Sequence, residues 1–141
     1  MCIRDRAIVD ALKALGVQNL AVATPYFEAM NQHEKVFLED NGFSIPSIEG
    51  LGYGANGKDE FRNIARVQPE QVIELAKRVH YTDAEALLIS CTDLVSLPVI
   101  SVLEKELDIP VISSNSATFW RALRMASVND EVESGGRLYT V

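Results

Sequence analysis

The stretch that decides the fold is Ala86-Leu87-Leu88-Ile89-Ser90-Cys91-Thr92-Asp93, in which an apolar run changes abruptly into small polar residues. This pattern is typical of a buried parallel strand whose carboxyl end opens into a loop. Ligands of open α/β sheets bind at those carboxyl ends, so Cys91 lies where chemistry is usually done. Backbone N–H groups that open a following helix would stabilise its thiolate. A buried cysteine without a chemical role fits this position equally well.

Two further strands are predicted to end in polar residues in the same way. Residues 20–23 are apolar and lead into Thr24-Pro25-Tyr26, and residues 111–113 lead into Ser114-Asn115-Ser116. A weaker strand over residues 43–51 contains a proline, which places it at an edge or makes it irregular. Segments with helical spacing of apolar residues separate the strands. The sequence therefore predicts an α/β fold with a four-stranded parallel sheet and helices on both faces.

Composition argues against several classes of partner. The chain has 141 residues, is 48% hydrophobic and carries a net charge of −7 without a Lys/Arg cluster, which argues against nucleic acid and anionic membranes. Its apolar runs are shorter than a membrane span, and no signal-peptide pattern is present. The two cysteines form neither a disulfide framework nor a metal site. We expect a cytoplasmic protein with no metal and no cofactor.

The glycines between residues 50 and 57 follow a weak strand and do not open a helix, so they are not a dinucleotide-binding fingerprint. They indicate a flexible loop over a site, or a long connection. Residues 1–6, Met-Cys-Ile-Arg-Asp-Arg, resemble a translated adapter remnant and are expected to be foreign to the protein. A helix is predicted over residues 7–16 with no strand before it, which suggests that the chain is the later part of a longer protein.

Three motifs carry a family resemblance: Ala-Thr-Pro-Tyr at 23–26 with Asn31, Ile-Ser-Cys-Thr at 89–92, and the run from Leu107 to Arg124. In this order they resemble the aspartate/glutamate racemase superfamily, and most closely its maleate cis-trans isomerase and arylmalonate decarboxylase branch. The resemblance covers nearly everything from Ala7 onward. Members of the superfamily have two similar α/β halves, with the active site between them and a cysteine at the matching strand end of each half.

The resemblance implies that this chain is one half of a two-domain racemase-like fold. Residues 7–16 would then belong with the missing first half, and residues 17–115 would form the racemase-like α/β domain. Residues 116–141, a helix and a tail, would return toward the missing half. Such a fragment is expected to be inactive alone, to fold marginally and to expose apolar helix surfaces that favour self-association.

The resemblance also assigns roles to residues of the candidate site. Cys91 would be the catalytic cysteine, while Tyr26 and the backbone N–H of Thr92 would bind a substrate carboxylate. Asn63 would bind the second carboxylate, and the alternative for Asn63 is a residue that only caps the loop. The remaining candidates for substrate binding are Thr24, Asn31 and Ser114. No cofactor is implied, and the full-length protein would be a homo-oligomer.

The function implied by the resemblance is isomerisation or racemisation of a small dicarboxylate through Cys91. The turn Cys91-Thr92-Asp93 lacks the glycines typical of the decarboxylases, which favours an aliphatic dicarboxylate. Phe61 and Ile64 nevertheless leave room for an apolar wall, so a decarboxylase that acts on arylmalonates with its single cysteine is the alternative. A third alternative is a catalytically silent binding or dimerisation module.

Overall fold

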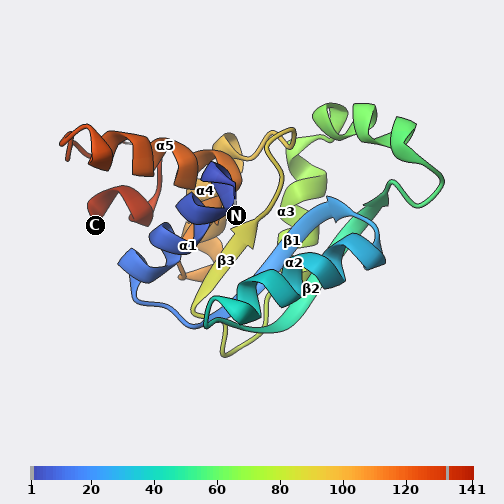
Figure 1. Ribbon diagram of the computed structural model, residues 1–141, viewed down its shortest axis with the longest axis horizontal. Helices are drawn as coiled ribbons and strands as arrows, with labels where there is room; N and C mark the ends of the chain where they lie inside the picture. Colours follow the sequence, from blue (N-terminus) through green and yellow to red (C-terminus); the bar gives the residue numbers. More distant parts are fainter. Residues whose placement is uncertain (1, 133) are drawn as a thin grey trace.

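The computed structural model describes residues 2–132 and 134–141. Its elements in chain order are α1 (Ile3–Leu15), β1 (Asn19–Tyr26), α2 (Glu28–Asp40), β2 (Ser44–Tyr53), the 3₁₀ helix η1 (Lys58–Arg66), α3 (Pro69–Val79), β3 (Ala86–Ile89), α4 (Leu97–Leu107), β4 (Val111–Ser113), α5 (Ser114–Met125) and the 3₁₀ helix η2 (Arg137–Thr140). The four strands form one sheet in the order β2-β1-β3-β4, and every pair is parallel (Figure 1). None of the described helices is long and apolar enough to cross a bilayer.

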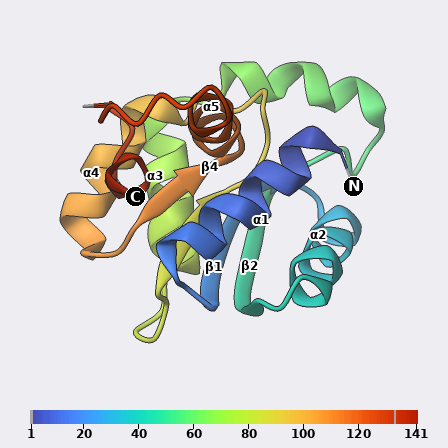
Figure 2. The ribbon, with the colours of Figure 1, turned by 60° about the vertical axis from the view of Figure 1, so that its left-hand side comes forward.

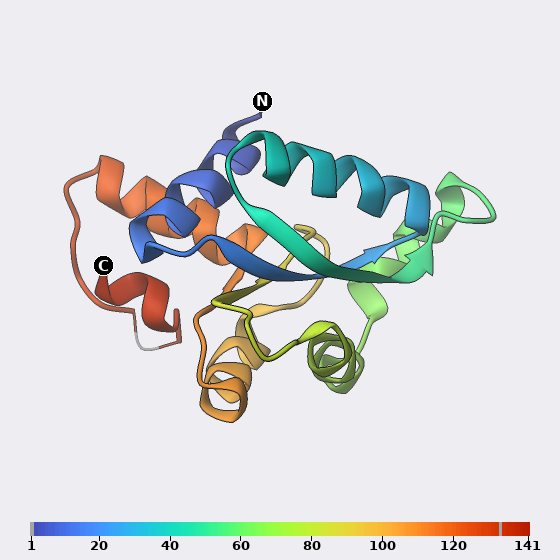
Figure 3. The same cartoon turned by 90° about the horizontal axis from the view of Figure 1, so that it is seen from below.

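Helices cover both faces of the sheet, as the sequence predicts. Figure 3 shows α1, α2 and α5 on one side of the strands and α3 and α4 on the other. Along β1, Leu20 and Val22 pack with the first group, whereas Ala21 and Ala23 pack with the second. Strands covered on both faces contain almost only apolar residues, which explains the continuous run that begins at Ala86. The predicted fold class is therefore confirmed.

The first helix starts earlier than predicted and packs within this chain. It begins at Ile3 rather than at residue 7, and the Cys2 N–H donates to the Asp5 carboxylate (2.9 Å) at its first turn. Val9 and Leu12 are buried in the core between this helix, the sheet and α5, which lies beside it (Figure 2). The apolar face that we expected to remain exposed is thus largely covered by the chain itself.

The predicted ends of β1 and β2 were too short. β1 continues through Pro25 to Tyr26. Its pairing with β3 ends at Ala23, so the N–H that Pro25 lacks is not needed for a hydrogen bond to β3. β2 lies at the sheet edge, as its proline indicates, but extends to Tyr53. Glycine at position 50 lets β2 approach β1 closely. Any other residue there would clash, because its Cβ would lie 1.9 Å from the Tyr26 carbonyl oxygen. The segment predicted as a loop after β2 includes η1.

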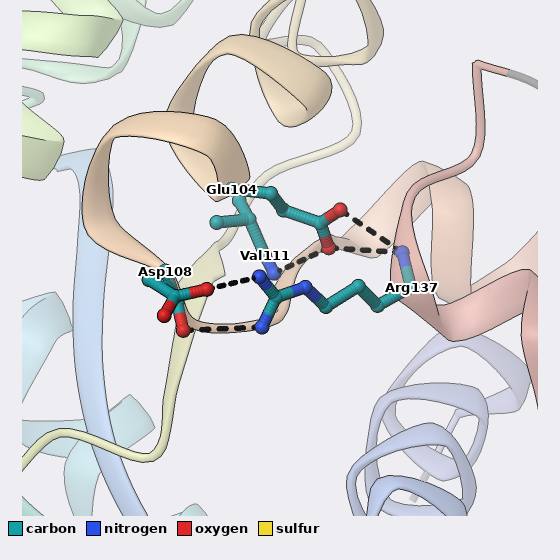
Figure 4. A network of polar contacts seen from close by, with 4 residues as sticks. All are labelled: Glu104, Asp108, Val111 and Arg137. Atoms are coloured by element: carbon teal, nitrogen blue, oxygen red, sulfur yellow. Dashed lines mark hydrogen bonds and ion pairs between the residues drawn. The ribbon is translucent and has the colours of Figure 1, made fainter.

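The C-terminal tail is held on α4 by the buried carboxylate of Glu104 (Figure 4). Glu104 Oε1 accepts the N–H of Val111 at 3.0 Å, and both carboxylate oxygens accept the N–H of Arg137 at 3.0 Å. The Arg137 guanidinium donates to the side chain (2.6 Å) and the carbonyl oxygen (3.1 Å) of Asp108. The tail therefore joins the end of α4 to the start of β4.

The same tail also supports α5. The Tyr139 hydroxyl donates to the Ser116 carbonyl oxygen (2.9 Å), and Trp120 Nε1 donates to the Val141 carbonyl oxygen (3.2 Å). Trp120 is buried, whereas Phe119 and Met125 are 55% and 72% exposed. Of the apolar residues predicted to form an exposed patch on this helix, these two remain uncovered in the described chain.

Substituting Glu104 by Ala is expected to lower the free energy of unfolding by about 2–3 kcal/mol, because the buried N–H of Val111 and the part-buried N–H of Arg137 lose their acceptor. Urea unfolding followed by circular dichroism measures the loss. The matched control is Glu106→Ala on the same helix, where the partly exposed pair with Lys77 (2.7 Å) is worth less than about 1 kcal/mol. Equal losses in the two variants would contradict the anchoring role of Glu104.

Candidate active site

Three strand ends meet at one edge of the sheet, as the sequence predicts. The strands β1, β3 and β4 are parallel neighbours, so their carboxyl ends face the same way. A cavity of about 420 Å³ lies beside these ends and is bounded by α1 and α2. The polar residues that line it from the strand ends are Tyr26, Ser90, Cys91, Thr92 and Ser114. The predicted placement of Tyr26, Cys91 and Ser114 at one edge is confirmed.

Cys91 stands in a strained backbone conformation directly after β3. Its φ angle is 125°, in the region that favours glycine, and such a conformation persists in a larger residue only when the surroundings enforce it. The start of α5 provides this constraint. The Cys91 N–H donates to Ser114 Oγ (3.1 Å), and Asn115 Nδ2 donates to the Thr92 carbonyl oxygen (3.1 Å). A capping box between Ser113 and Ser116 in turn fixes that helix end.

Tyr26 lines the same cavity as Cys91. Burial raises the pKa of Tyr26 well above its usual range, and a hydrogen bond donated to Cys91 and the charge of a Cys91 thiolate raise it further. The Tyr26 phenol therefore stays protonated and can donate. Its ring makes an edge-to-face contact with Phe61, with centroids 6.3 Å apart at 88°. This contact fixes the direction of the hydroxyl.

Two predicted site residues, Thr24 and Asn31, are buried behind the end of β1 and support it. Thr24 and Asn31 are fully buried, and the Thr24 hydroxyl donates to Asn31 Oδ1 (2.5 Å). Thr24 Oγ1 also accepts the Tyr26 N–H (3.0 Å). Neither residue lines the cavity. They hold the backbone of Tyr26 in place, and the structure gives them no direct access to a ligand there.

Asn63 lies apart from the predicted group. It is exposed on η1 and lines neither the cavity beside Cys91 nor a second hollow of about 300 Å³ next to it. Its neighbours Phe61 and Ile64 do line that second hollow, together with Cys91. In this helical segment, residues 61 and 64 share a face that residue 63 does not, which explains the difference.

Thr92 is placed as predicted. It lines both hollows, and its backbone N–H donates to no other residue in the described chain, so it is free to meet an anion. Its hydroxyl accepts a hydrogen bond from Arg4 Nη1 (3.1 Å). This bond joins the first turn of α1 to the loop after β3.

The prediction missed the contribution of α2. Residues of this helix line the cavity at positions 30, 33, 34, 37 and 38, the spacing of one helical face. Glu34 is the acidic residue in the middle of this face, beside Met30, Phe37 and Leu38. A carboxylate within an otherwise apolar stripe was the available signal. His33 is exposed and also borders the cavity.

The arrangement brings one thiol together with several fixed hydrogen-bond donors. A thiol can add to carbon or transfer a proton, and donors such as Tyr26, Ser114 and the Thr92 N–H can stabilise negative charge that develops next to it. Within residues 2–132 and 134–141, no group of three or more His, Cys, Asp or Glu side chains could hold a metal ion. The fold and the site define an α/β protein with a cysteine-based site.

The chain belongs to the arylmalonate decarboxylase family, whose model matches residues 3–139. Arylmalonate decarboxylase of Bordetella bronchiseptica is 32% identical over 136 residues, which cover 94% of this chain and 55% of that protein. Maleate isomerase of Nocardia farcinica is 32% identical over 133 residues, which cover 94% of this chain and 51% of that protein. The chain therefore spans about half the length of these curated relatives, and the predicted family resemblance is confirmed.

Solved structures show the same relationship. A crystal structure of arylmalonate decarboxylase matches with a TM-score of 0.83 and 31% identity, covering 96% of this chain and 59% of that one. A mutant of Nocardia farcinica maleate cis-trans isomerase with a covalently bound succinylcysteine intermediate matches with a TM-score of 0.87 and 28% identity. That match covers 94% of this chain and 53% of the other.

Strain at Cys91 predicts an unusual order of stabilities. Cys91→Gly should be more stable than Cys91→Ala by about 1 kcal/mol or more, because glycine adopts a positive φ without steric cost. Both variants lose the thiol, so the difference between their free energies of unfolding reports the backbone strain at position 91. Urea midpoints of the two variants give the comparison. A glycine variant that unfolds at lower urea than the alanine variant would show that the backbone of Cys91 is not strained.

Proposed function

We propose that this chain carries the Cys91 half of the active site of an enzyme that isomerises a small dicarboxylate without a cofactor. The observation that carries the proposal is that Tyr26, Cys91 and Thr92 line one cavity at the carboxyl edge of the sheet. The whole enzyme would contain a further half, since the relatives are about twice as long. The cytoplasmic location and the homo-oligomer stay predictions from the sequence.

The proposed reaction follows from a thiolate beside fixed donors. The Cys91 thiolate forms a bond to one alkene carbon of a maleate-like substrate, and the alkene electron pair moves toward the adjacent carboxylate. The Tyr26 hydroxyl and the Thr92 N–H stabilise the enediolate that results. The former double bond is now single, so rotation about this carbon–carbon bond, followed by return of the electron pair and expulsion of the thiolate, restores the double bond in the trans form. The succinylcysteine in the related isomerase structure is an intermediate of the corresponding kind and supports this course.

Decarboxylation is the second candidate, and the second hollow favours it. Phe61, Ile64 and Met30 give this space beside Cys91 an apolar side that fits an aryl group. A substituted malonate would lose carbon dioxide, and Cys91 would protonate the enediolate that remains. The Thr92 and Asp93 side chains at the catalytic turn lead us to rank isomerisation first. A silent binding module is the outcome in which neither reaction occurs.

In the full-length protein, Cys91→Ser is expected to reduce turnover at least about a thousandfold, because a hydroxyl is a far weaker acid and nucleophile than a thiol. Cys2→Ser is the matched control and should retain the parent rate, because Cys2 is exposed at the start of the chain. Conversion of maleate, aspartate, glutamate and an arylmalonate is followed by chromatography.

The substrate that is converted distinguishes isomerisation or racemisation from decarboxylation. A Cys91→Ser variant that retains the parent rate on the converted substrate would contradict the role of the thiol. Absence of turnover on all four compounds by the parent protein would favour the silent module.

A further inference from the structure

Glu34 is the one acidic side chain that α2 presents to the Cys91 cavity within the described residues. It is half-buried and lies on the same helical face as Met30 and Phe37, which surround it with apolar surface. Ser90 lines the same cavity, and its hydroxyl acts to lower the pKa of the Glu34 carboxyl group. Ser90 directly precedes Cys91, so the carboxyl group of Glu34 lies next to the catalytic strand end. The proposed mechanism does not use it.

The charges around Glu34 leave it without a strong cationic partner. The polar groups that face the cavity are Arg4 and Asp5 from α1, His33 from α2, Tyr26 from β1, Ser90, Cys91 and Thr92 after β3, and Ser114 from α5. No ion pair within 4.0 Å involves Glu34 among the described residues, and Arg4 donates to Thr92 instead. Burial raises the pKa of Glu34, the Ser90 hydrogen bond opposes this, and Asp5 adds a further rise. Burial and an acidic neighbour thus favour the uncharged carboxyl.

We propose that Glu34 determines which ligand charge the Cys91 cavity accepts: its carboxyl is protonated when a small dicarboxylate occupies the cavity, and its ionised form excludes anions. The inference rests on the proposed function, because that function supplies an anionic substrate. A protonated carboxyl adds one donor to those of Tyr26 and Thr92. An ionised carboxylate in the same confined space would instead repel both carboxylates of the substrate. Glu34 is therefore a specificity-determining residue, and it does not react.

The direction of the pH dependence follows from this. Below its raised pKa Glu34 is neutral and anions enter the cavity; as the pH rises through that pKa, Glu34 ionises and entry of anions declines. The amide of Glu34→Gln copies the shape of the neutral acid and cannot ionise. Anion entry in this variant should not decline over the same range.

Alkylation of Cys91 in the 141-residue chain measures anion entry without requiring turnover. Iodoacetate is an anionic reagent and iodoacetamide a neutral one of similar size, and both react with the thiolate. Mass spectrometry of the Cys91 peptide gives the alkylation rate with each reagent. Changes in thiol ionisation and in steric access affect both rates equally, so the ratio of the two rates reports the effect of reagent charge. In the parent chain this ratio should fall about fivefold from mildly acidic to mildly alkaline pH, the effect of a screened unit charge. In Glu34→Gln it should stay constant.

Two further variants complete the experiment. Glu39→Gln makes the same change on the same helix, where the carboxylate is exposed and pairs with Lys35, and should behave like the parent chain. His33→Gln should also retain the fall, which separates the imidazole from the carboxyl. A parent ratio that does not change with pH, or a fall that survives in Glu34→Gln, would overturn the proposal. Failure of the proposed function would be seen in a different experiment, as full activity of the Cys91→Ser variant of the full-length protein.

Discussion

The site depends on one constraint, the strained backbone of Cys91 held from the start of α5. A parallel sheet brings three strand ends to one edge, but it does not fix the direction of a side chain in the loop that follows. Ser114 accepts the Cys91 N–H and Asn115 donates to the Thr92 carbonyl oxygen, so two bonds from one helix end fix the peptide before Cys91 and the peptide after Thr92. Because this helix end is itself capped, the Cys91 conformation is enforced by packed structure.

Support for this constraint extends across the chain to the C-terminal tail. Tyr139 bonds to the carbonyl oxygen of Ser116 at the first turn of α5, and Glu104 holds the tail on α4 next to Arg137. Gly136 permits this approach, because a Cβ there would lie 2.8 Å from the Glu104 carboxylate. The tail is therefore anchored on α4 and α5 of this chain, and it reinforces the helix end that holds Cys91.

The sequence predicts the fold well because the central strands β1 and β3 are buried on both faces and contain apolar runs, as from Ala86 to Ile89. The positions of Tyr26, Cys91, Thr92 and Ser114 follow from strand ends alone. The roles of Thr24 and Asn31 could not be predicted, because a polar residue at a strand end can face the ligand or the core, and only packing decides. Asn63 was placed wrongly with respect to the cavity because the turn of η1 sets its direction. Glu34 was not predicted as a site residue because acidic side chains on helices are mostly exposed, and only the packing of α2 beside the strand ends places it at the cavity.

The central claim is that Cys91 forms a covalent bond to the substrate. The most direct measurement is mass spectrometry of the full-length protein after acid quenching during turnover of maleate. The account predicts a peptide containing Cys91 with the added mass of one maleate, and an unmodified Cys2 peptide. Steady turnover with Cys91 unmodified at every quench time would contradict the claim.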